Sequence, residues 1–588
     1  MPKYTSTSHR PLSELRRKPP AFWLWFPLLI LFSCCWGCSD ASVPSPILKV
    51  GLLEEPKSLN PWRSSDAWSS RILSLIYQPL YIRDPESLEF VPWLADSDPV
   101  YDDAAISYRI TIRDARWSDG EPLTSEDVAY TAELIKAFRI PRYYANWEFV
   151  DRVETPDKHT IVFYLSSRRA TFTTRSLTTP IVSRREWEPI AGPLRNTDAP
   201  LPALLNHPLE RPVGSGPFSL VEWKRGGYLH LRRNDRFFGK GRTINRRLLG
   251  PYLDGILFKL YGTSDTAVLA LKKGSLDMFW WGIQPGYLKG LAETDHIDLH
   301  SNEKSALYYL GLNLRKPPFS DIRFRRAVAV LVDKDFILDR LLQGHGVVMD
   351  TIVPPGNRFW HSAHVPLHGK GLTRIERAKT ALGILRDAGY RWEVPPRIDD
   401  RGIRSAGRKL TDSKGNPVPP ITILTPPADY DPMRAQAGIF IQEWLKSIGL
   451  SATAKPISFS SLSEQVRVRR EFDAFIHGYG NLSLDPDYVR SFFHSRFDRI
   501  HGRNTSGYRN PEFDSLSDLS ASTMDRGDRQ QLLHRMQRMI AGDLPWIPLY
   551  NPHIIEAVRT DRFTGWVDMP VGIGNWWSFC QLKPVDRR

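Results

Sequence analysis

Apolar and polar residues follow strand-like and helical patterns in turn along most of the chain. The apolar, β-branched run 47–54 predicts a buried strand, and 106–117 alternates in the manner of an antiparallel strand. Between them, 69–81 places apolar residues at helical spacing. Residues 124–138 read as a helix with Thr124 at its N-cap and acids in its first turn. The chain therefore begins its folded part with strands and helices mixed together.

The mixture continues to the C-terminal region without an internal repeat. Further strands are predicted at 159–165, 255–262, 421–427 and 472–480, with a hairpin over 213–234 and helices at 319–342 (two), 376–390 and 436–449. Residues 264–279 predict a helix that runs into a short strand, and 529–552 predict a helix followed by a strand. Residues 189–213 form a proline-rich connection, and the polar stretch 391–420 predicts a surface insertion or hairpin. This succession indicates an α/β or α+β architecture with mixed sheets.

The length points to more than one core. At 588 residues, the chain is several times the roughly 100 to 200 residues of one domain. A strand near 303–315 crosses into a new helical stretch, and a late strand near 545–550 returns to pair with an earlier part. We therefore predict a first lobe from 47–307 plus 531–588 and a second lobe from 308–530.

The N-terminal region carries a targeting signal. Arg10, Arg16, Arg17 and Lys18 precede the uncharged apolar run 21–33, which would rise only about 20 Å as a helix. That length is short for a bilayer and suits the apolar core of an export signal, here 1–33. Extending the run to Cys38 leaves an uncleaved membrane anchor as the alternative.

The cysteines indicate lipid attachment rather than disulfides. Three of the four cysteines lie at 34, 35 and 38, and only Cys580 lies elsewhere, which excludes a disulfide framework. The stretch LFSC resembles the lipobox of bacterial lipoproteins and predicts lipidation at Cys34, with Cys38 as the competing site. The polar segment 34–46 would then be a tether between lipid and protein.

Composition and charge exclude several function classes. With 41% hydrophobic and 11% aromatic residues, the chain is too apolar for a disordered protein. The 79 basic residues exceed the 65 acidic ones to give +14, but they are scattered, and no nucleic-acid-binding motif accompanies them. The charge favours a protein that works beside an anionic membrane, with no nucleic-acid partner.

Several short motifs have structural interpretations. WSDGEPLTSEDV (117–128) predicts a tight turn that leads into a capped helix, and VGSGPF (213–218) predicts a close backbone approach under a neighbouring strand. The Gly-x-Ser-x-Gly spacing of a nucleophile elbow and the Gly-Lys-Ser/Thr of a phosphate loop are both missing from the sequence. His361, His364 and His368 lie in a proline-broken stretch without accompanying acids, so no metal site is predicted.

The order of a set of segments resembles the extracellular solute-binding proteins of the peptide and nickel class, which serve ABC importers. The segments are EEPKSLNPW (54–62), IYQPLY (76–81), YRITIRDARWSDGEPLTSEDVAYT (108–131), VGSGPFSLVEW (213–223), ALKKGSLDM (270–278), GLNLRKPPFSDIRFRRAVAVLVDKDFIL (311–338), GVVMDTIVPPG (346–356), AKTALGILRDAGY (378–390) and LPWIPLY (544–550). The resemblance implies a two-lobed periplasmic binding protein fold of type II, peptide-binding class, with mixed sheets and a hinge.

The same resemblance implies a function. The protein would capture oligopeptides in a closing cleft and deliver them to an ABC permease with a separate ATPase subunit. It would be a monomer without enzymatic activity or cofactor, anchored by lipid on the periplasmic side of the cell envelope. The alternatives are another cargo on the same scaffold, such as an oligosaccharide or metal complex, or a peptide-sensing receptor. No catalytic constellation supports an envelope hydrolase.

Candidate ligand contacts lie on one loop and near two tryptophan pairs. The loop GYGNLSLDPDY (478–488) resembles the family loop that ends in Asp-Pro-Asp, but the acid that would pair with a peptide ammonium is missing from it. Either Asp485 or Asp487 substitutes, or the ligand's N-terminus is not bound here, or the ligand is not a free-ended peptide. Each of the aromatic candidates also fits a hydrophobic core. The complete set of candidates is Tyr479, Asn481, Asp485, Asp487, Trp280, Trp281, Trp576 and Trp577.

Overall fold

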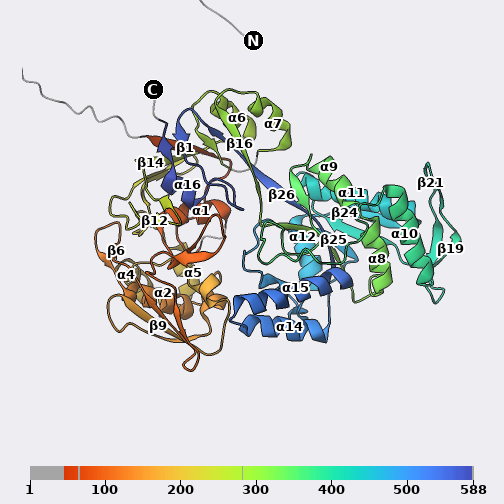
Figure 1. Cartoon of the computed structure of the whole chain (residues 1–588), viewed down its shortest axis with the longest axis horizontal. Coiled ribbons are helices and arrows are strands. Elements are labelled where there is room, and N and C mark those ends of the chain that lie inside the picture. The colour runs from red at the N-terminus through yellow and green to blue at the C-terminus, as the bar shows by residue number, and fades with distance from the viewer. Residues whose placement is uncertain (1–45, 64–65, 281–282, 586–588) are drawn as a thin grey trace, which may run out of the picture. The chain divides into compact units, whose positions relative to one another are not determined.

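The computed structural model describes residues 46–63, 66–280 and 283–585, and its elements are shown in Figure 1. The predicted export signal, Cys34, Cys38 and Trp281 lie outside the described residues. In the first half of the chain the elements are β1 (Ile47–Leu52), α1 (Ala67–Ile76), β2 (Tyr81–Arg83), β3 (Phe90–Pro92), β4 (Val100–Asp102), β5 (Ser107–Thr111), β6 (Ala115–Arg116), β7 (Pro122–Leu123), α2 (Ser125–Ala137), α3 (Tyr144–Trp147), β8 (Val150–Glu154), β9 (Thr160–Leu165), a π-helical turn (Phe172–Ser176), α4 (Arg184–Leu194), α5 (Pro200–Asn206), β10 (Phe218–Lys224), β11 (Tyr228–Arg233), β12 (Thr243–Ile244), β13 (Arg247–Leu248), β14 (Gly255–Leu260), α6 (Ser264–Lys272), β15 (Met278–Phe279), α7 (Pro285–Ala292) and β16 (Ile297–Glu303).

The second half mixes helices and strands in the same way. Its elements are β17 (Leu307–Leu312), α8 (Ile322–Leu331), α9 (Lys334–Leu341), β18 (Gly346–Val348), α10 (Arg374–Asp387), β19 (Arg391–Val394), β20 (Arg397–Asp399), β21 (Gly402–Ser405), β22 (Arg408–Thr411), β23 (Ile421–Thr425), α11 (Pro432–Ser447), β24 (Ala452–Pro456), α12 (Phe459–Glu464), β25 (Ala474–Tyr479), α13 (Tyr488–Phe493), α14 (Pro511–Ser522), α15 (Arg526–Asp543), β26 (Trp546–Arg559), β27 (Phe563–Thr564), α16 (Trp576–Gln581) and β28 (Lys583–Pro584).

A mixed sheet of twelve strands connects the two halves. Its main path runs β10-β11-β14-β1-β15-β26-β17-β25-β23-β24, with β16 and β18 also paired to β26. Strand β1 runs parallel to β14 and β15, whereas β17 runs antiparallel to β25 and β26. The predicted mixed sheet is therefore confirmed.

Strand β26 is the element that both halves share. Its first part pairs with β17 and β18, and its last part pairs with β15 and β16. In Figure 1 this long blue strand runs from the elements of the second half to those of the first. In the described part of the chain, strand β26 alone joins β15 to β17. Its removal would divide the sheet into two.

The apolar side chains gather into separate cores on the two sides of β26. One core contains residues between Leu48 and Trp280 together with Val558–Leu582. Two others contain residues between Leu307 and Tyr550, including Leu533, Met536 and Ile540 of α15. We call the elements around these cores the first lobe and the second lobe. The residue boundaries given above for the two lobes stay a prediction.

Most predicted elements are present, because their signals are local. Thr124 begins α2 with a capping box in which Asp127 accepts the Thr124 N–H at 2.9 Å. The polar insertion 391–420 folds as the paired strands β19–β22 and β20–β21. The hairpin β10–β11 and the helix pair α8 and α9 also lie where they were predicted.

Four predictions need correction. Helix α1 ends at Ile76 rather than near Leu80, because Tyr77 is already extended and Pro79 follows. The strand predicted over 106–117 is divided into β5 and β6. The connection 189–213 contains the second half of α4 and all of α5, and burial of Trp187 and Ala191 outweighs the two prolines inside α4. The glycines of 213–218 approach the end of α1 rather than a strand, and their ideal Cβ atoms would lie 2.0 and 2.2 Å from its carbonyl oxygens.

Candidate functional site

A hollow of about 350 Å³ opens where segments of both lobes meet. The first lobe contributes the turn between β2 and β3, and the second lobe contributes residues 355–360 and Arg526. Asn302 and Glu303, at the end of β16, lie where the chain crosses between the lobes. The loop Asp568–Pro570 completes the wall. We call this space the interlobe hollow.

A second pocket of about 320 Å³ continues from the interlobe hollow, because Arg83 and Met569 line both. Its walls are mostly apolar and come from α1, the β2–β3 hairpin, α16 and the loop before it. The principal apolar side chains are Leu73, Tyr77, Phe90, Tyr143, Val571 and Trp576. We call this space the apolar pocket. Larger hollows lie on α2 and β8, at about 490 Å³, and beside β19 and β22, at about 540 Å³, but each is lined by one lobe alone.

Arg83 stands where the two spaces join. Its guanidinium lies 4.0 Å from the centre of the Phe90 ring and donates to the carbonyl of Leu88. Burial lowers the pKa of this guanidinium to about 10, while nearby Asp485 and Glu89 act in the opposite direction. The side chain is therefore still a cation at neutral pH.

The acids around the interlobe hollow already have partners. Glu303 Oε1 accepts the Gly356 N–H at 2.7 Å and the Asn551 amide at 3.2 Å. Asp568 Oδ1 contacts His300 Nδ1 at 3.1 Å and accepts the Asn302 amide at 2.9 Å. These contacts fix the wall of the hollow and use the acceptors that a cationic ligand would need.

A buried charge cluster holds the loop that forms one wall of the apolar pocket. Arg71 donates to the carbonyl oxygens of Val571 at 2.8 Å and Gly574 at 3.3 Å. Glu556 accepts the Ile573 N–H at 2.5 Å. Burial raises the pKa of Glu556 to about 7, opposed by the charge of Arg71 and these hydrogen bonds. The loop 571–575 is thus tied to α1 and β26 at once.

The structure places the two predicted acids in ion pairs. Asp485 is buried and forms two hydrogen bonds with Arg529, at 2.7 and 2.8 Å. Asp487 pairs in the same way with Arg490, at 2.9 and 3.0 Å. Each carboxylate therefore has a cation of its own in this conformation, and ligand contact by either stays a prediction.

The predicted aromatic residues are divided among separate places. Trp280 is fully buried in the first-lobe core, where it stacks on Phe258. Tyr479 stacks on Phe492 within a second-lobe core, and the neighbouring Asn481 is exposed. Trp576 and Trp577 line the apolar pocket. The structure thus places one of the two predicted tryptophan pairs in a pocket, and the ligand contacts themselves stay predictions.

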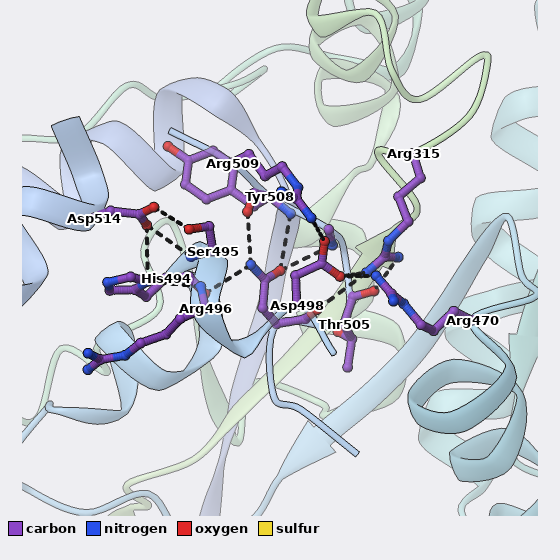
Figure 2. Close-up of polar contacts among 12 residues, drawn as sticks. Arg315, Arg470, His494, Ser495, Arg496, Asp498, Thr505, Tyr508, Arg509 and Asp514 are labelled. Atoms are coloured by element: carbon purple, nitrogen blue, oxygen red, sulfur yellow. Dashed lines mark hydrogen bonds and ion pairs between the residues drawn. The ribbon is translucent and has the colours of Figure 1, made fainter. Parts of the chain in front are cut away.

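The loop that follows the predicted acids is held by an internally paired charge cluster. Figure 2 shows Asp498 with three arginines around it, Arg315, Arg470 and Arg509. Burial raises the pKa of Asp498, but Arg315 and the other arginines outweigh it and lower the pKa below its usual range. Because the carboxylate is satisfied by protein side chains, we interpret this cluster as structural.

The remaining candidate features do not form a site among the residues that the structure describes. His361 and His368 make their contacts with backbone carbonyls, at 2.8 and 2.9 Å. Within 46–63, 66–280 and 283–585, no group of three metal-ligating side chains converges. In the same ranges, no helix has the length and apolar character needed to cross a bilayer.

Sequence reasoning selected Trp576 and Trp577 but missed the other residues that build the apolar pocket. Arg83, Phe90, Arg142 and Tyr143 belong to segments for which the sequence pattern predicted no element and no site. One available signal was IYQPLY, which precedes Arg83 and was identified among the family segments. Trp577 Nε1 donates to the Arg83 carbonyl at 2.8 Å, and this contact joins positions almost 500 apart, which hydrophobic periodicity cannot show.

Comparison with known proteins agrees with this geometry. The fold is that of the two-lobed periplasmic binding proteins, as its structural neighbours show. The chain belongs to the bacterial extracellular solute-binding proteins, family 5, whose model matches residues 89–498. The resemblance found in the sequence is therefore confirmed.

Individual relatives cover nearly the whole chain. The oligopeptide-binding protein AppA of Bacillus subtilis is 26% identical over 544 residues, which cover 90% of this chain and 91% of the relative. Its solved structure in complex with a nonapeptide has a TM-score of 0.67 at 24% identity, covering 92% of this chain and 99% of that one. The structure of NikZ from Campylobacter jejuni in complex with Ni(L-His) has a TM-score of 0.68 at 20% identity, covering 92% of this chain and 100% of that one.

Proposed function

We propose that this protein captures oligopeptides between its lobes and delivers them to an ABC permease. The observation that carries the proposal is the interlobe hollow and its continuation into the apolar pocket, in a member of a solute-binding family. The similarity to an oligopeptide-binding relative over 90% of the chain supports peptide as the cargo. Hinge closure around the ligand would then complete the site.

The chemistry of the two spaces suits a peptide. The interlobe hollow offers amide and guanidinium groups, which can bind a polar backbone and anionic groups. The apolar pocket offers a wall for a side chain. Each volume is near the lower end of the roughly 300 to 1,000 Å³ of ligand pockets, so a peptide would occupy both.

The proposal includes a place and partners for the protein. We propose a non-enzymatic, monomeric lipoprotein on the periplasmic side of the cell envelope, with lipid on Cys34 or, alternatively, Cys38. The basic segment, apolar run and small residue before Cys34 support this attachment. A permease and an ATPase subunit would be separate chains, and a role in peptide sensing remains the alternative use of the same site.

A ligand screen by thermal unfolding tests the function. A ligand that binds only the native state stabilises it by RT ln(1 + [L]/Kd), about 2.7 kcal/mol at one hundred times Kd. We expect pools of peptides to raise the unfolding temperature in a concentration-dependent way. Oligosaccharides and a nickel–histidine complex serve as parallel cargoes. A shift with one of these and none with any peptide pool would replace oligopeptide with that cargo.

A further inference from the structure

Three of the polar side chains that line the apolar pocket are already satisfied by the protein itself. Ser74 Oγ donates to the Arg71 carbonyl at 2.6 Å. The Gln78 amide donates to two carbonyls of α1 and its end, at 2.7 and 2.9 Å, and accepts from Trp93. The Asn575 amide donates to Val567 and Gly572. These three side chains therefore leave little unused hydrogen bonding for a ligand. Within the described residues, Tyr77 Oη and Trp576 Nε1 make no hydrogen bond, so they are the polar atoms that a ligand could still meet.

The remaining surface favours a bulky apolar group. Trp576, Phe90 and Tyr143 provide aromatic faces, and Leu73 and Val571 provide aliphatic contacts. Aromatic walls give large apolar contact areas with defined stacking geometries. At about 320 Å³, the space holds a side chain or two rather than a whole oligopeptide.

The charged side chains that line the apolar pocket are all cationic. Arg83 and Arg142 are its charged lining residues, and no carboxylate among the described residues lines it. The nearest acids on the β2–β3 turn are engaged elsewhere, since Glu86 pairs with Arg247 at 2.6 Å and Glu89 with Arg526. Arg142 also donates to Ser70 Oγ at 3.1 Å. The mouth of the pocket thus presents cations beside an apolar interior.

We propose that the apolar pocket binds a bulky apolar side chain of the cargo while Arg83 binds a carboxylate beside that side chain. This inference rests on the proposed peptide function and names the class of peptide. Two sources share this chemistry: the α-carboxylate of a peptide that ends in an apolar residue, and an acidic residue next to an internal apolar one. Because Arg83 lies where the pocket meets the interlobe hollow, the rest of the peptide extends into the hollow.

A set of related pentapeptides tests the proposal by titration calorimetry on the full chain. The set contains Ala-Ala-Ala-Ala-Phe as acid and as amide, pentaalanine as acid, and Ala-Ala-Phe-Asp-Ala as amide. We expect the Phe acid to bind about tenfold to a hundredfold more tightly than pentaalanine, which corresponds to burial of one large side chain. If the Phe amide binds as tightly as the Phe acid, Arg83 does not bind a carboxylate of the peptide. Recovery of affinity by the internal Phe-Asp peptide would assign the carboxylate to an acidic side chain.

Two variants locate the effect, each with a matched control. Ser74→Phe fills the pocket from α1, and Ser522→Phe makes the same change on α14, where the serine also donates to backbone carbonyls of its own helix. Arg83→Met removes the charge, and Arg152→Met removes a strand arginine that likewise lies over a ring, that of Tyr164. Ser74→Phe should abolish the preference for Phe over Ala, and Arg83→Met should abolish the preference for acid over amide.

The outcomes separate this inference from the proposed function. If all four pentapeptides bind equally well, peptide capture stands and the apolar pocket is not the specificity site. If Ser74→Phe or Arg83→Met behaves like its control while the preferences persist, the pocket assignment is wrong. If no peptide of any composition binds, the proposed function itself fails. A circular dichroism melt of each variant establishes that it is folded.

Discussion

Asp485 shows how one residue can join distant parts of the molecule. Its carboxylate accepts two hydrogen bonds from Arg529 of α15 and one from Thr174 of the first lobe, the last at 2.9 Å. Burial alone would raise the pKa of this carboxyl, but the charge and hydrogen bonds of Arg529 outweigh it and lower the pKa to about 2. The native state therefore holds the ionised form more strongly than the unfolded chain does.

Replacing Asp485 should weaken the fold strongly at neutral pH. Asp485→Asn leaves the buried Arg529 without its counter-charge, at an expected cost of about 3–5 kcal/mol in the free energy of unfolding. Because the folded pKa lies below the unfolded value of about 3.9, the ionised carboxylate contributes stability above pH 4. That contribution is lost as the pH falls from about 4 through 2. Urea unfolding of wild type and variant at pH 7 and in this acid range measures both effects.

Asp528→Asn is the matched control, since Asp528 is an exposed acid in the first turn of the same helix. We expect it to change stability by no more than about 1 kcal/mol. Equal urea concentrations at the unfolding midpoint for the Asp485→Asn and Asp528→Asn variants would contradict a stabilising role for the Asp485–Arg529 pair.

The same residue shows the limit of sequence analysis for the site. The loop 478–488 was recognised from its motif, and its two acids were candidates for ligand contact. Arg529 lies 44 residues further along the chain, and a single sequence contains no signal that pairs the two. The charge partners of a carboxylate decide whether it is available, and those partners are set by tertiary packing.

Local sequence signals were sufficient to predict some helices, but they could not predict an element that depends on tertiary packing. Capped helices such as α2 and α10 were predictable because Thr124 and Thr373 and the acids three residues later satisfy the first N–H groups. Helix α4 was not, because the burial of its Trp187 is a property of the folded lobe. Its two prolines are strong local signals in the opposite direction.

The contact between α1 and the segment before β10 yields a test at this scale. The Gly216 N–H donates to the Ile76 carbonyl at 2.8 Å, and an ideal Cβ on Gly216 would lie 2.2 Å from the Leu75 oxygen. Gly216→Ala must therefore displace α1 or the segment, at a cost of at least about 1–3 kcal/mol. Differential scanning calorimetry should show a lower unfolding temperature.

Gly286→Ala provides the comparison, because nothing lies within 4 Å of an ideal Cβ there, on helix α7. Alanine in an open helical position is expected to be neutral or to stabilise by a few tenths to about 1 kcal/mol. If the Gly216→Ala protein unfolds at the same temperature as the Gly286→Ala protein, the close approach of Gly216 to α1 is not required.

At the scale of the whole molecule, the lobes meet at more than the shared strand. The Ala170 N–H donates to the Ala521 carbonyl at 3.2 Å, Thr174 donates to Asp485, and Arg526 pairs with Glu89. The order of the segments was enough to predict two lobes. It could not place this second contact, since its residues belong to loops and helix ends without a recognisable pattern.

A cross-link across this contact tests whether the lobes separate during ligand exchange. Their backbone hydrogen bond brings Ala170 and Ala521 close enough for a disulfide between cysteines at both positions to be tried. If opening at this contact admits ligand, the oxidised double variant should exchange a bound peptide at least about tenfold more slowly, as expected when a lid is held shut. Stopped-flow displacement of a fluorescent peptide measures the rate. The reduced protein and each single-cysteine variant should exchange at the wild-type rate, and an unchanged rate after oxidation would place the opening elsewhere.

The position of strand β26 in the sequence also affects folding of the chain during its synthesis. It follows in the chain every strand with which it pairs, namely β15, β16, β17 and β18. A growing polypeptide therefore leaves the ribosome with neither half of the sheet complete until residues 546–559 emerge. In most multidomain proteins the N-terminal domain folds first during synthesis, but here the edges of β15 and β17 that pair with β26 stay unpaired until β26 is made. For the export that we propose, this delay would keep the chain in the incompletely folded state that a secretion channel can accept.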